Sequence, residues 1–130
     1  MLCRKEEAMA KTVLIVDDSD ASRDSLAFAL KQRKFNIIEA KDGLAALLLL
    51  KKGTALDLII TDINMPNMTG LELVKSARTM DAYRFTPIIV LSSEKEEIKK
   101  STEAGASAWI GKSGHMSEQL METIKKLIPE

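Results

Sequence analysis

Five short apolar runs alternate along the chain with segments of helical spacing. The runs are VLIV at 13–16, NIIEA at 36–40, LDLIIT at 56–61, TPIIVLS at 86–92 and SAWIG at 107–111. Four of them are apolar almost throughout, which is typical of strands that are covered on both faces in a parallel sheet. NIIEA is more polar than the other runs, so it is predicted to form an edge strand.

The segment after each run has the spacing of a helix that buries one face. The clearest is the last, with apolar residues at i, i+4, i+7 and i+8 from Leu120, and it ends at Pro129. Five strands, each followed by a helix, predict a three-layer doubly wound α/β fold, (βα)5, with a five-stranded parallel sheet and right-handed crossovers. We expect one domain over 11–130 after a frayed N-terminus at 1–10.

The segment at 94–105 differs from the other predicted helices. Ile98 is its only large apolar residue, so little hydrophobic burial can hold this helix in place. Elements of this kind belong to the least stable part of a fold and are able to shift. The segment is therefore either an ordinary solvated helix or an element that moves during function.

Composition restricts the possible functions. The 130 residues, 45% hydrophobic and 29% charged, are typical of one globular domain. Nineteen basic and nineteen acidic residues cancel, so no overall field attracts the protein directly to nucleic acid or to a membrane. The longest apolar run, at 44–50, is far shorter than the roughly 20 residues that span a bilayer. Cys3 is the only cysteine, which excludes an internal disulfide and favours a cytoplasmic location.

Polar side chains gather where the predicted strands end. The first strand runs into Asp17 and Asp18, the third into Asp62, the fourth into Ser92 and the fifth into Lys112. Ligands of a doubly wound sheet bind at the carboxyl ends of its strands, so these side chains are expected to converge on one edge. Clustered carboxylates repel one another unless a cation neutralises them. Oxygen ligands beside a phosphate site favour Mg²⁺.

Each of these residues also has a simple structural explanation. Asp18, Ser19 or Asp20 can cap the helix that follows, and Ser92 can do the same for a later one. Asp62 can begin a turn, and Lys112 can be an ordinary solvated lysine. Capping explains neither why the acids follow the first and third strands nor why a lysine ends the fifth. Asp20 is assigned to the helix start rather than to the metal.

Four motifs resemble the receiver domain of bacterial two-component response regulators. They are VLIVDDS with Arg23, LIITDINMP with Gly70, PIIVLSS and GASAWIGK, in this order and each in the matching strand context. The resemblance covers about 11–128. It implies the flavodoxin-like strand order 2-1-3-4-5, and a signalling protein rather than an enzyme. The sequence is similar to stand-alone regulators of the chemotaxis or phosphorelay type.

The resemblance implies a chemical role for the residues at the strand ends. Asp62 accepts a phosphoryl group from a sensor histidine kinase or a phosphotransfer protein. Asp17, Asp18 and Asp62 bind Mg²⁺ together with the backbone carbonyl of Asn64. Lys112 contacts the phosphoryl oxygens and, with Mg²⁺, neutralises the charge of the transferred group.

The resemblance also implies how the phosphorylated state is recognised and how long it lasts. Ser92 bonds a phosphoryl oxygen and forms a switch with Trp109, which changes the 94–128 face that a downstream protein recognises. Trp109 has the alternative of being an ordinary core or exposed aromatic residue. Asn64 and Glu94 flank the approach of water and are expected to tune the lifetime of the phosphorylated state. The protein is expected to be either a monomer or a weak dimer that forms only on phosphorylation.

One residue departs from the family pattern. Ser113 follows Lys112 at a position where the family usually has proline, often after a cis peptide bond. A cis bond before a residue other than proline costs about 2.5–4 kcal/mol. The geometry of the Lys112–Ser113 peptide, and with it the reach of Lys112, therefore stays open.

Three other functions have partial support in the sequence. A nucleotide-binding P-loop ending in GKS would require glycine where Ala106 stands. The stretch DSDAS at 18–22 resembles the first motif of haloacid-dehalogenase-like phosphatases, but that family places its last acidic motif after the lysine. The only acids after Lys112 fall on the predicted last helix. An interaction module that is never phosphorylated remains an alternative, although such a module would normally have lost part of the site.

Overall fold

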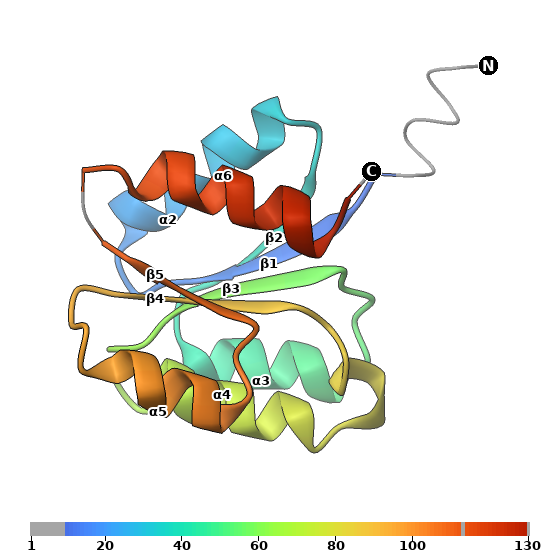
Figure 1. Cartoon of the computed structure of the whole chain (residues 1–130). Coiled ribbons are helices and arrows are strands. Elements are labelled where there is room, and N and C mark those ends of the chain that lie inside the picture. The colour runs from blue at the N-terminus through green and yellow to red at the C-terminus, as the bar shows by residue number, and fades with distance from the viewer. Residues whose placement is uncertain (1–9, 113, 130) are drawn as a thin grey trace.

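The computed structural model describes residues 10–112 and 114–129, and it confirms the predicted doubly wound architecture (Figure 1). All strands are parallel, in the order β2-β1-β3-β4-β5. The strands are β1 Thr12–Val16, β2 Asn36–Ala40, β3 Leu58–Asp62, β4 Ile88–Ser92 and β5 Ala108–Gly111. The helices are α2 Asp20–Gln32, α3 Gly43–Lys51, α4 Gly70–Arg78, α5 Glu97–Ala104 and α6 Met116–Leu127, with a short 3₁₀ helix η1 at Asp81–Tyr83.

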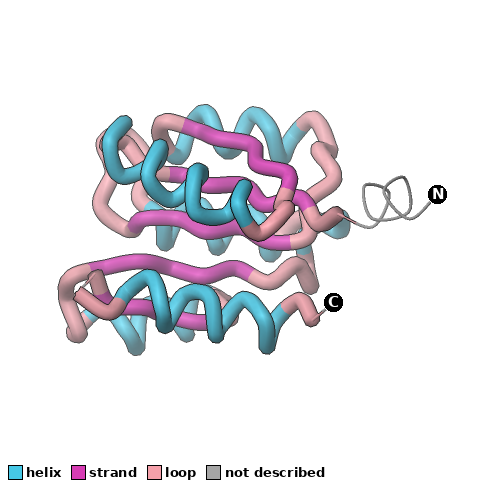
Figure 2. The backbone as a smooth tube through the Cα atoms, turned by 90° about the horizontal axis from the view of Figure 1, so that it is seen from above, coloured by secondary structure: helices cyan, strands magenta, loops and turns pink. Residues whose placement is uncertain are grey.

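Helices cover both faces of the sheet, as Figures 1 and 2 show from two directions. Alternate residues of β1, β3 and β4 point to opposite faces and enter two separate apolar clusters. One cluster lies between the sheet and α3, α4 and α5. The other lies between the sheet and the pair α2 and α6. Burial on both faces is the physical reason why these strands are apolar almost throughout.

The more polar run forms the edge strand, as predicted. Among the described strands β2 pairs with β1 alone, while β3 and β4 in the centre are buried along their whole length. The sequence did not predict η1. Tyr83 in η1 is 2% exposed, and its hydroxyl donates a hydrogen bond to the carbonyl oxygen of Thr54 at 2.6 Å.

The helix predicted at 94–105 is shorter in the structure. It begins at Glu97 and ends at Ala104, and Ile98 is 41% exposed. The buried residues of α5 are two small ones, Ser101 and Ala104. Its C-terminal end is held by Arg78, whose Nε donates to the carbonyl oxygen of Gly105 at 2.9 Å. The prediction that little apolar burial holds this helix is confirmed.

Some sequence predictions fall outside the described residues. These are residues 1–9 of the N-terminus predicted to be frayed at 1–10, which include Cys3, and the Lys112–Ser113 peptide bond. Within the part of the chain that the structure describes, no helix has both the length and the apolar character needed to cross a membrane.

Candidate functional site

Three carboxylates meet at the carboxyl ends of β1 and β3. One oxygen from each of Asp17, Asp18 and Asp62 lies within 4.8 Å of the others. The neighbouring strands β1 and β3 bring them together, because Val16 is paired with Thr61 directly before the acids begin. Asp17 is 6% exposed and Asp62 is 7% exposed, whereas Asp18 faces solvent. The expectation that the acids converge on one edge of the sheet is therefore confirmed, while their roles remain predictions.

Lys112 reaches the same cluster from the end of β5. Its Nζ lies 2.7 Å from Oδ1 of Asp62. The backbone N–H of Lys112 donates to the carbonyl oxygen of Ser92 at 2.9 Å, which continues the pairing of β5 with β4. The Lys112 side chain is 35% exposed, whereas the Asp62 side chain is 9% exposed. The buried carboxylate of Asp62 is thus paired with a lysine that is partly exposed to solvent.

The ionisation of Asp62 is set by opposing influences. Burial raises its pKa above the ordinary aspartate value. The hydrogen bond and positive charge of Lys112 act in the opposite direction, and the negative charges of Asp17 and Asp18 add to the increase. The net effect is a raised pKa, so keeping Asp62 ionised costs the folded protein free energy.

This pKa shift predicts the stability of the Asp62→Asn variant in buffer with a metal chelator. A raised folded-state pKa means that stability is highest below the unfolded-state pKa and falls as pH rises through the folded-state value. At neutral pH the whole cost is present, so the variant is expected to be more stable by about 1 kcal/mol, a rise in Tm of a few degrees. The gain should shrink in acid, whereas Asp81→Asn, at an exposed position on η1, should change little. Equal Tm values for the wild type and Asp62→Asn, both at neutral pH and in acid, would contradict the prediction.

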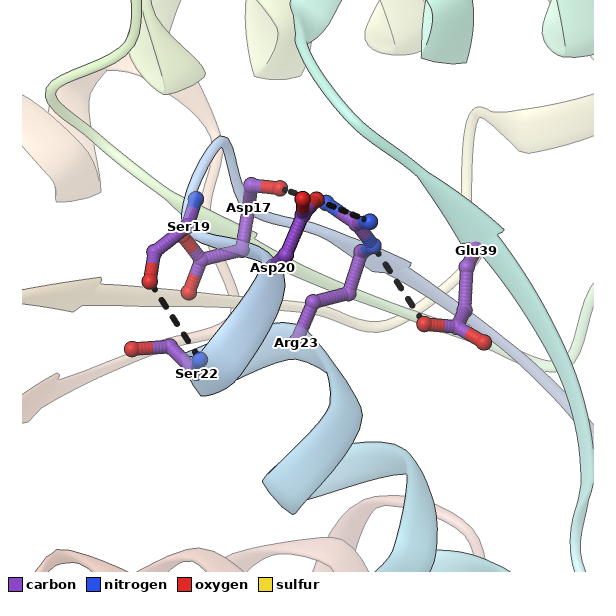
Figure 3. A network of polar contacts seen from close by, with 6 residues as sticks. All are labelled: Asp17, Ser19, Asp20, Ser22, Arg23 and Glu39. Carbon is purple, nitrogen blue, oxygen red and sulfur yellow. Dashed lines mark hydrogen bonds and ion pairs between the residues drawn. The ribbon is translucent and has the colours of Figure 1, made fainter.

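Arg23 of α2 fixes the loop that carries the first two acids (Figure 3). Its guanidinium donates to the backbone carbonyl oxygen of Asp17 at 2.8 Å, and to Glu39 on β2 at 3.3 Å. A third bond, of 2.6 Å, reaches Asp20, whose side chain is 83% exposed, so that pair contributes little to stability. The bond to Asp17 matters more, because it orients the backbone between β1 and α2.

The start of α2 adds further constraints to this loop (Figure 3). Ser19 is the N-cap of α2, and its hydroxyl accepts a hydrogen bond from the backbone N–H of Ser22. The backbone N–H of Ser19 in turn donates to Oδ1 of Asp17 at 2.9 Å. Asp20 is the first residue of α2, in agreement with its assignment to the helix start.

Gly70, the first residue of α4, lies against the backbone of Asp62. A Cβ atom at this position would be 2.0 Å from the carbonyl oxygen of Asp62. The backbone N–H of Gly70 donates to the carbonyl oxygen of Ile63 at 2.8 Å. Only glycine fits here, so the close approach of α4 fixes the backbone that carries Asp62.

The residues expected to signal lie at the end of β4, on the loops that follow β4 and β3, and in β5. Ser92 is 1% exposed, and its hydroxyl donates to Oε1 of Glu97 at 2.5 Å. Glu94 and Asn64 are exposed, on the loops that follow β4 and β3. Trp109 packs against the apolar cluster under α3, α4 and α5, and its Nε1 is buried without a hydrogen-bond partner among the described residues.

Sequence reasoning overlooked what three residues do at this site. Arg23 and Gly70 stood in the recognised motifs, but nothing in the sequence showed that one holds the Asp17 carbonyl and the other touches the Asp62 backbone. The role of Glu97 could not be predicted, because the sequence does not distinguish it from the other acids of a charged segment. Their contacts depend on how helices sit against strand ends, which a linear pattern does not record.

Comparison with known proteins identifies the family. The family model described as the response regulator receiver domain matches residues 13–125. The chain belongs to the response regulator receiver family. A receiver domain is a signalling protein and the phosphoryl-accepting partner in two-component signalling.

Individual relatives and solved structures agree with this assignment. The receiver domain is 35% identical to chemotaxis protein CheY-3 of Vibrio cholerae over 121 residues, covering 88% of this chain and 92% of the relative. It is 32% identical to chemotaxis protein CheY of Pseudomonas aeruginosa, with coverages of 88% and 94%. The solved structure of the response regulator CheY4 of Vibrio cholerae superimposes with a TM-score of 0.85 at 35% identity, covering 92% of this chain and all of the other (100%).

A further solved structure bears on the metal. The response regulator TrrA of Thermotoga maritima, crystallised in complex with Mg²⁺ and BeF, matches with a TM-score of 0.81 at 33% identity, over 91% of this chain and 99% of that one. Receiver domains generally bind Mg²⁺ at an acidic pocket. The present donor set fits such an ion, because hard carboxylate oxygens lie within 4.8 Å of one another and Mg²⁺ prefers oxygen ligands.

Proposed function

We propose that Asp62 is the phosphoryl acceptor of this receiver domain and that a histidine kinase or phosphotransfer protein is its donor. The observation that carries the proposal is the position of the Asp62 carboxylate. One of its oxygens lies within 4.8 Å of oxygens of Asp17 and Asp18, and Oδ1 lies 2.7 Å from the ammonium of Lys112. A nucleophile placed between a cation site and a fixed positive charge is suited to attack a phosphoryl group.

The transfer exchanges one bond to phosphorus for another. An oxygen of the Asp62 carboxylate attacks the phosphorus of the donor's phosphohistidine. The P–N bond breaks, its electron pair returns to the imidazole nitrogen, and an O–P bond forms to give an acyl phosphate. Lys112 holds the oxygens of the incoming group by charge and hydrogen bonds, since its ammonium has more than one proton to donate.

Asp17, Asp18 and Asp62, with the backbone carbonyl of Asn64, are the residues that would hold Mg²⁺. When bound, the ion supplies positive charge that neutralises the carboxylates and the transferred phosphoryl group. The residues themselves contribute position. Arg23 fixes the Asp17 backbone and Gly70 the Asp62 backbone, so two of the ligands are held in place by contacts from neighbouring helices.

The lifetime of the acyl phosphate is a further property of the loops around Asp62. Water breaks the O–P bond, releases inorganic phosphate and returns Asp62 to its free carboxylate. Asn64 and Glu94 are exposed on the flanking loops, where they can hinder or assist that water. We expect Asn64→Ala and Glu94→Ala to change the dephosphorylation rate by a fewfold to about tenfold. The rate is measured as the loss of the phosphoryl mass with time. Unchanged rates in both variants would contradict this role.

Ser92 and Trp109 form the proposed switch. When Ser92 donates to a phosphoryl oxygen, the space near it changes, and the indole of Trp109 can leave a position in which its N–H has no hydrogen-bond partner among the described residues. An unsatisfied buried donor costs about 1–3 kcal/mol, so the present position of Trp109 is easily displaced. As the only tryptophan, it reports directly: its fluorescence should change when Mg²⁺ and beryllofluoride are added together. A flat signal would count against this coupling.

The output is proposed to be a protein contact through the 94–128 face. The relatives named chemotaxis proteins support a chemotaxis-type output. Within that face, α5 has little buried apolar surface, which suits a surface that is altered by phosphorylation and then recognised by a target.

Incubation with acetyl phosphate tests the proposed function. Intact mass spectrometry should show one added phosphoryl group with Mg²⁺ and none with a chelator. A phosphatase would instead release phosphate over many turnovers without carrying a label. Absence of any label with Mg²⁺ present would favour an interaction module that is never phosphorylated.

A further inference from the structure

The Ser92 hydroxyl already has a partner, the carboxylate of Glu97. Ser92 Oγ donates to Glu97 Oε1 at 2.5 Å and accepts from the backbone N–H of Glu94 at 3.1 Å. Ser92 is 1% exposed and Glu97 is half-buried. The distance to Glu97 lies in the range of charge-assisted O–H···O⁻ bonds, which are stronger than neutral ones.

A serine hydroxyl has a single proton to donate. In the proposed function, Ser92 donates that proton to a phosphoryl oxygen on Asp62. It cannot donate to Glu97 at the same time. The Glu97 carboxylate and the phosphoryl group therefore compete for one donor.

Glu97 is also the first residue of α5, so this bond holds one end of that helix. Ile98, which follows it, is 41% exposed and offers little apolar anchoring. The opposite end of α5 is held separately by the bond from Arg78 to the Gly105 carbonyl oxygen. Loss of the bond to Ser92 would free the N-terminal turn of α5 while its C-terminal end stays attached.

We propose that Glu97 is an autoinhibitory positioning residue that keeps the Ser92 hydroxyl from the phosphoryl site and releases the first turn of α5 when the phosphoryl group takes that hydroxyl. The inference rests on the proposed function of Asp62. One hydrogen bond then sets two properties together, the affinity of the site for a phosphoryl group and the position of α5. Because coupling between two sites is reciprocal, a target that binds the released α5 strengthens binding at the phosphoryl site by the same factor.

The affinity for beryllofluoride, measured by fluorine NMR titration at saturating Mg²⁺, tests this inference. Glu97→Ala removes the competing acceptor and should tighten beryllofluoride binding by about tenfold, the effect expected for one hydrogen bond to a charged group. Glu97→Gln keeps a weaker, neutral acceptor and should give a smaller gain. Glu96→Gln is the matched control, since Glu96 is exposed and makes no side-chain cap bond; it should leave the affinity unchanged. Mg²⁺ affinity should be the same in all of these proteins.

The Ser92→Ala background separates competition for the hydroxyl from a general charge effect. Adding Glu97→Ala to Ser92→Ala should leave beryllofluoride affinity unchanged, because the contested proton is absent. A tenfold gain that persists in this background would overturn the inference, and so would equal affinities of the wild type and Glu97→Ala. In both cases the wild type still binds beryllofluoride and the proposed function stands. A wild type that does not bind beryllofluoride at all would overturn the inference and the proposed function together.

Discussion

Replacing Lys112 by alanine is expected to slow phosphorylation by acetyl phosphate by about 10²–10³-fold, the usual cost of losing one positioned charge donor at a reacting oxygen. The side chain lies 2.7 Å from Asp62 Oδ1, so it is placed to hold the phosphoryl oxygens as they arrive. Its loss also removes the interactions that oppose the raised pKa of Asp62.

Two further variants make the Lys112 result specific. Lys112→Arg keeps the charge but changes the shape of the donor, and it should recover only part of the rate. Lys41→Ala removes an exposed lysine that directly follows β2 at the same edge of the sheet, and its rate should match the wild type. A Lys112→Ala protein that is labelled as fast as the Lys41→Ala control would show that the ammonium plays no part in the transfer.

Replacing Gly70 by alanine is expected to lower the free energy of unfolding by about 2–4 kcal/mol, a large loss for overpacking at one residue. The added methyl group would be 2.0 Å from the Asp62 carbonyl oxygen and 2.9 Å from its carbonyl carbon. These are backbone atoms at the end of a central strand, so α4 or the end of β3 has to move. Any displacement of β3 also moves the Asp62 carboxylate away from Lys112, and phosphorylation should fall in the fraction that remains folded.

Gly114→Ala is the matched control for this substitution. A Cβ atom at Gly114 would meet nothing within 4 Å, so its free energy of unfolding should stay close to the wild-type value in urea denaturation. If Gly70→Ala were as stable as Gly114→Ala, the close approach of α4 to the Asp62 backbone would not be a real constraint.

The strands and their ends could be predicted because they follow from burial. A strand covered on both faces has to be apolar, so β1, β3 and β4 stand out, and the first polar residue after each one lies at the ligand-binding edge. Asp17 and Asp18 after β1, Asp62 at the end of β3 and Ser92 at the end of β4 are predicted in this way, and Lys112 follows the fifth run in the same manner. Their convergence could be inferred before any distance was known, while the strand order itself came from the resemblance to receiver domains.

The contacts that hold the site in place could not be predicted, because they depend on distances between elements. Glu97 bonds to Ser92 only because α5 begins at that residue, three residues later than the charged segment suggested. The acids of that segment look alike in sequence. Likewise, η1 is stabilised by a tertiary bond from Tyr83 to Thr54 and has no periodic pattern of its own.

The identity of the labelled residue tests the central claim most directly. After reaction with acetyl phosphate and Mg²⁺, borohydride reduction converts an aspartyl phosphate to homoserine, and peptide mass spectrometry locates it. The account predicts one modified residue, Asp62, and an Asp62→Asn protein that is folded but gains no phosphoryl mass. Equal labelling of Asp62→Asn, or a modification found at Asp17 or Asp18 in the wild type, would contradict it.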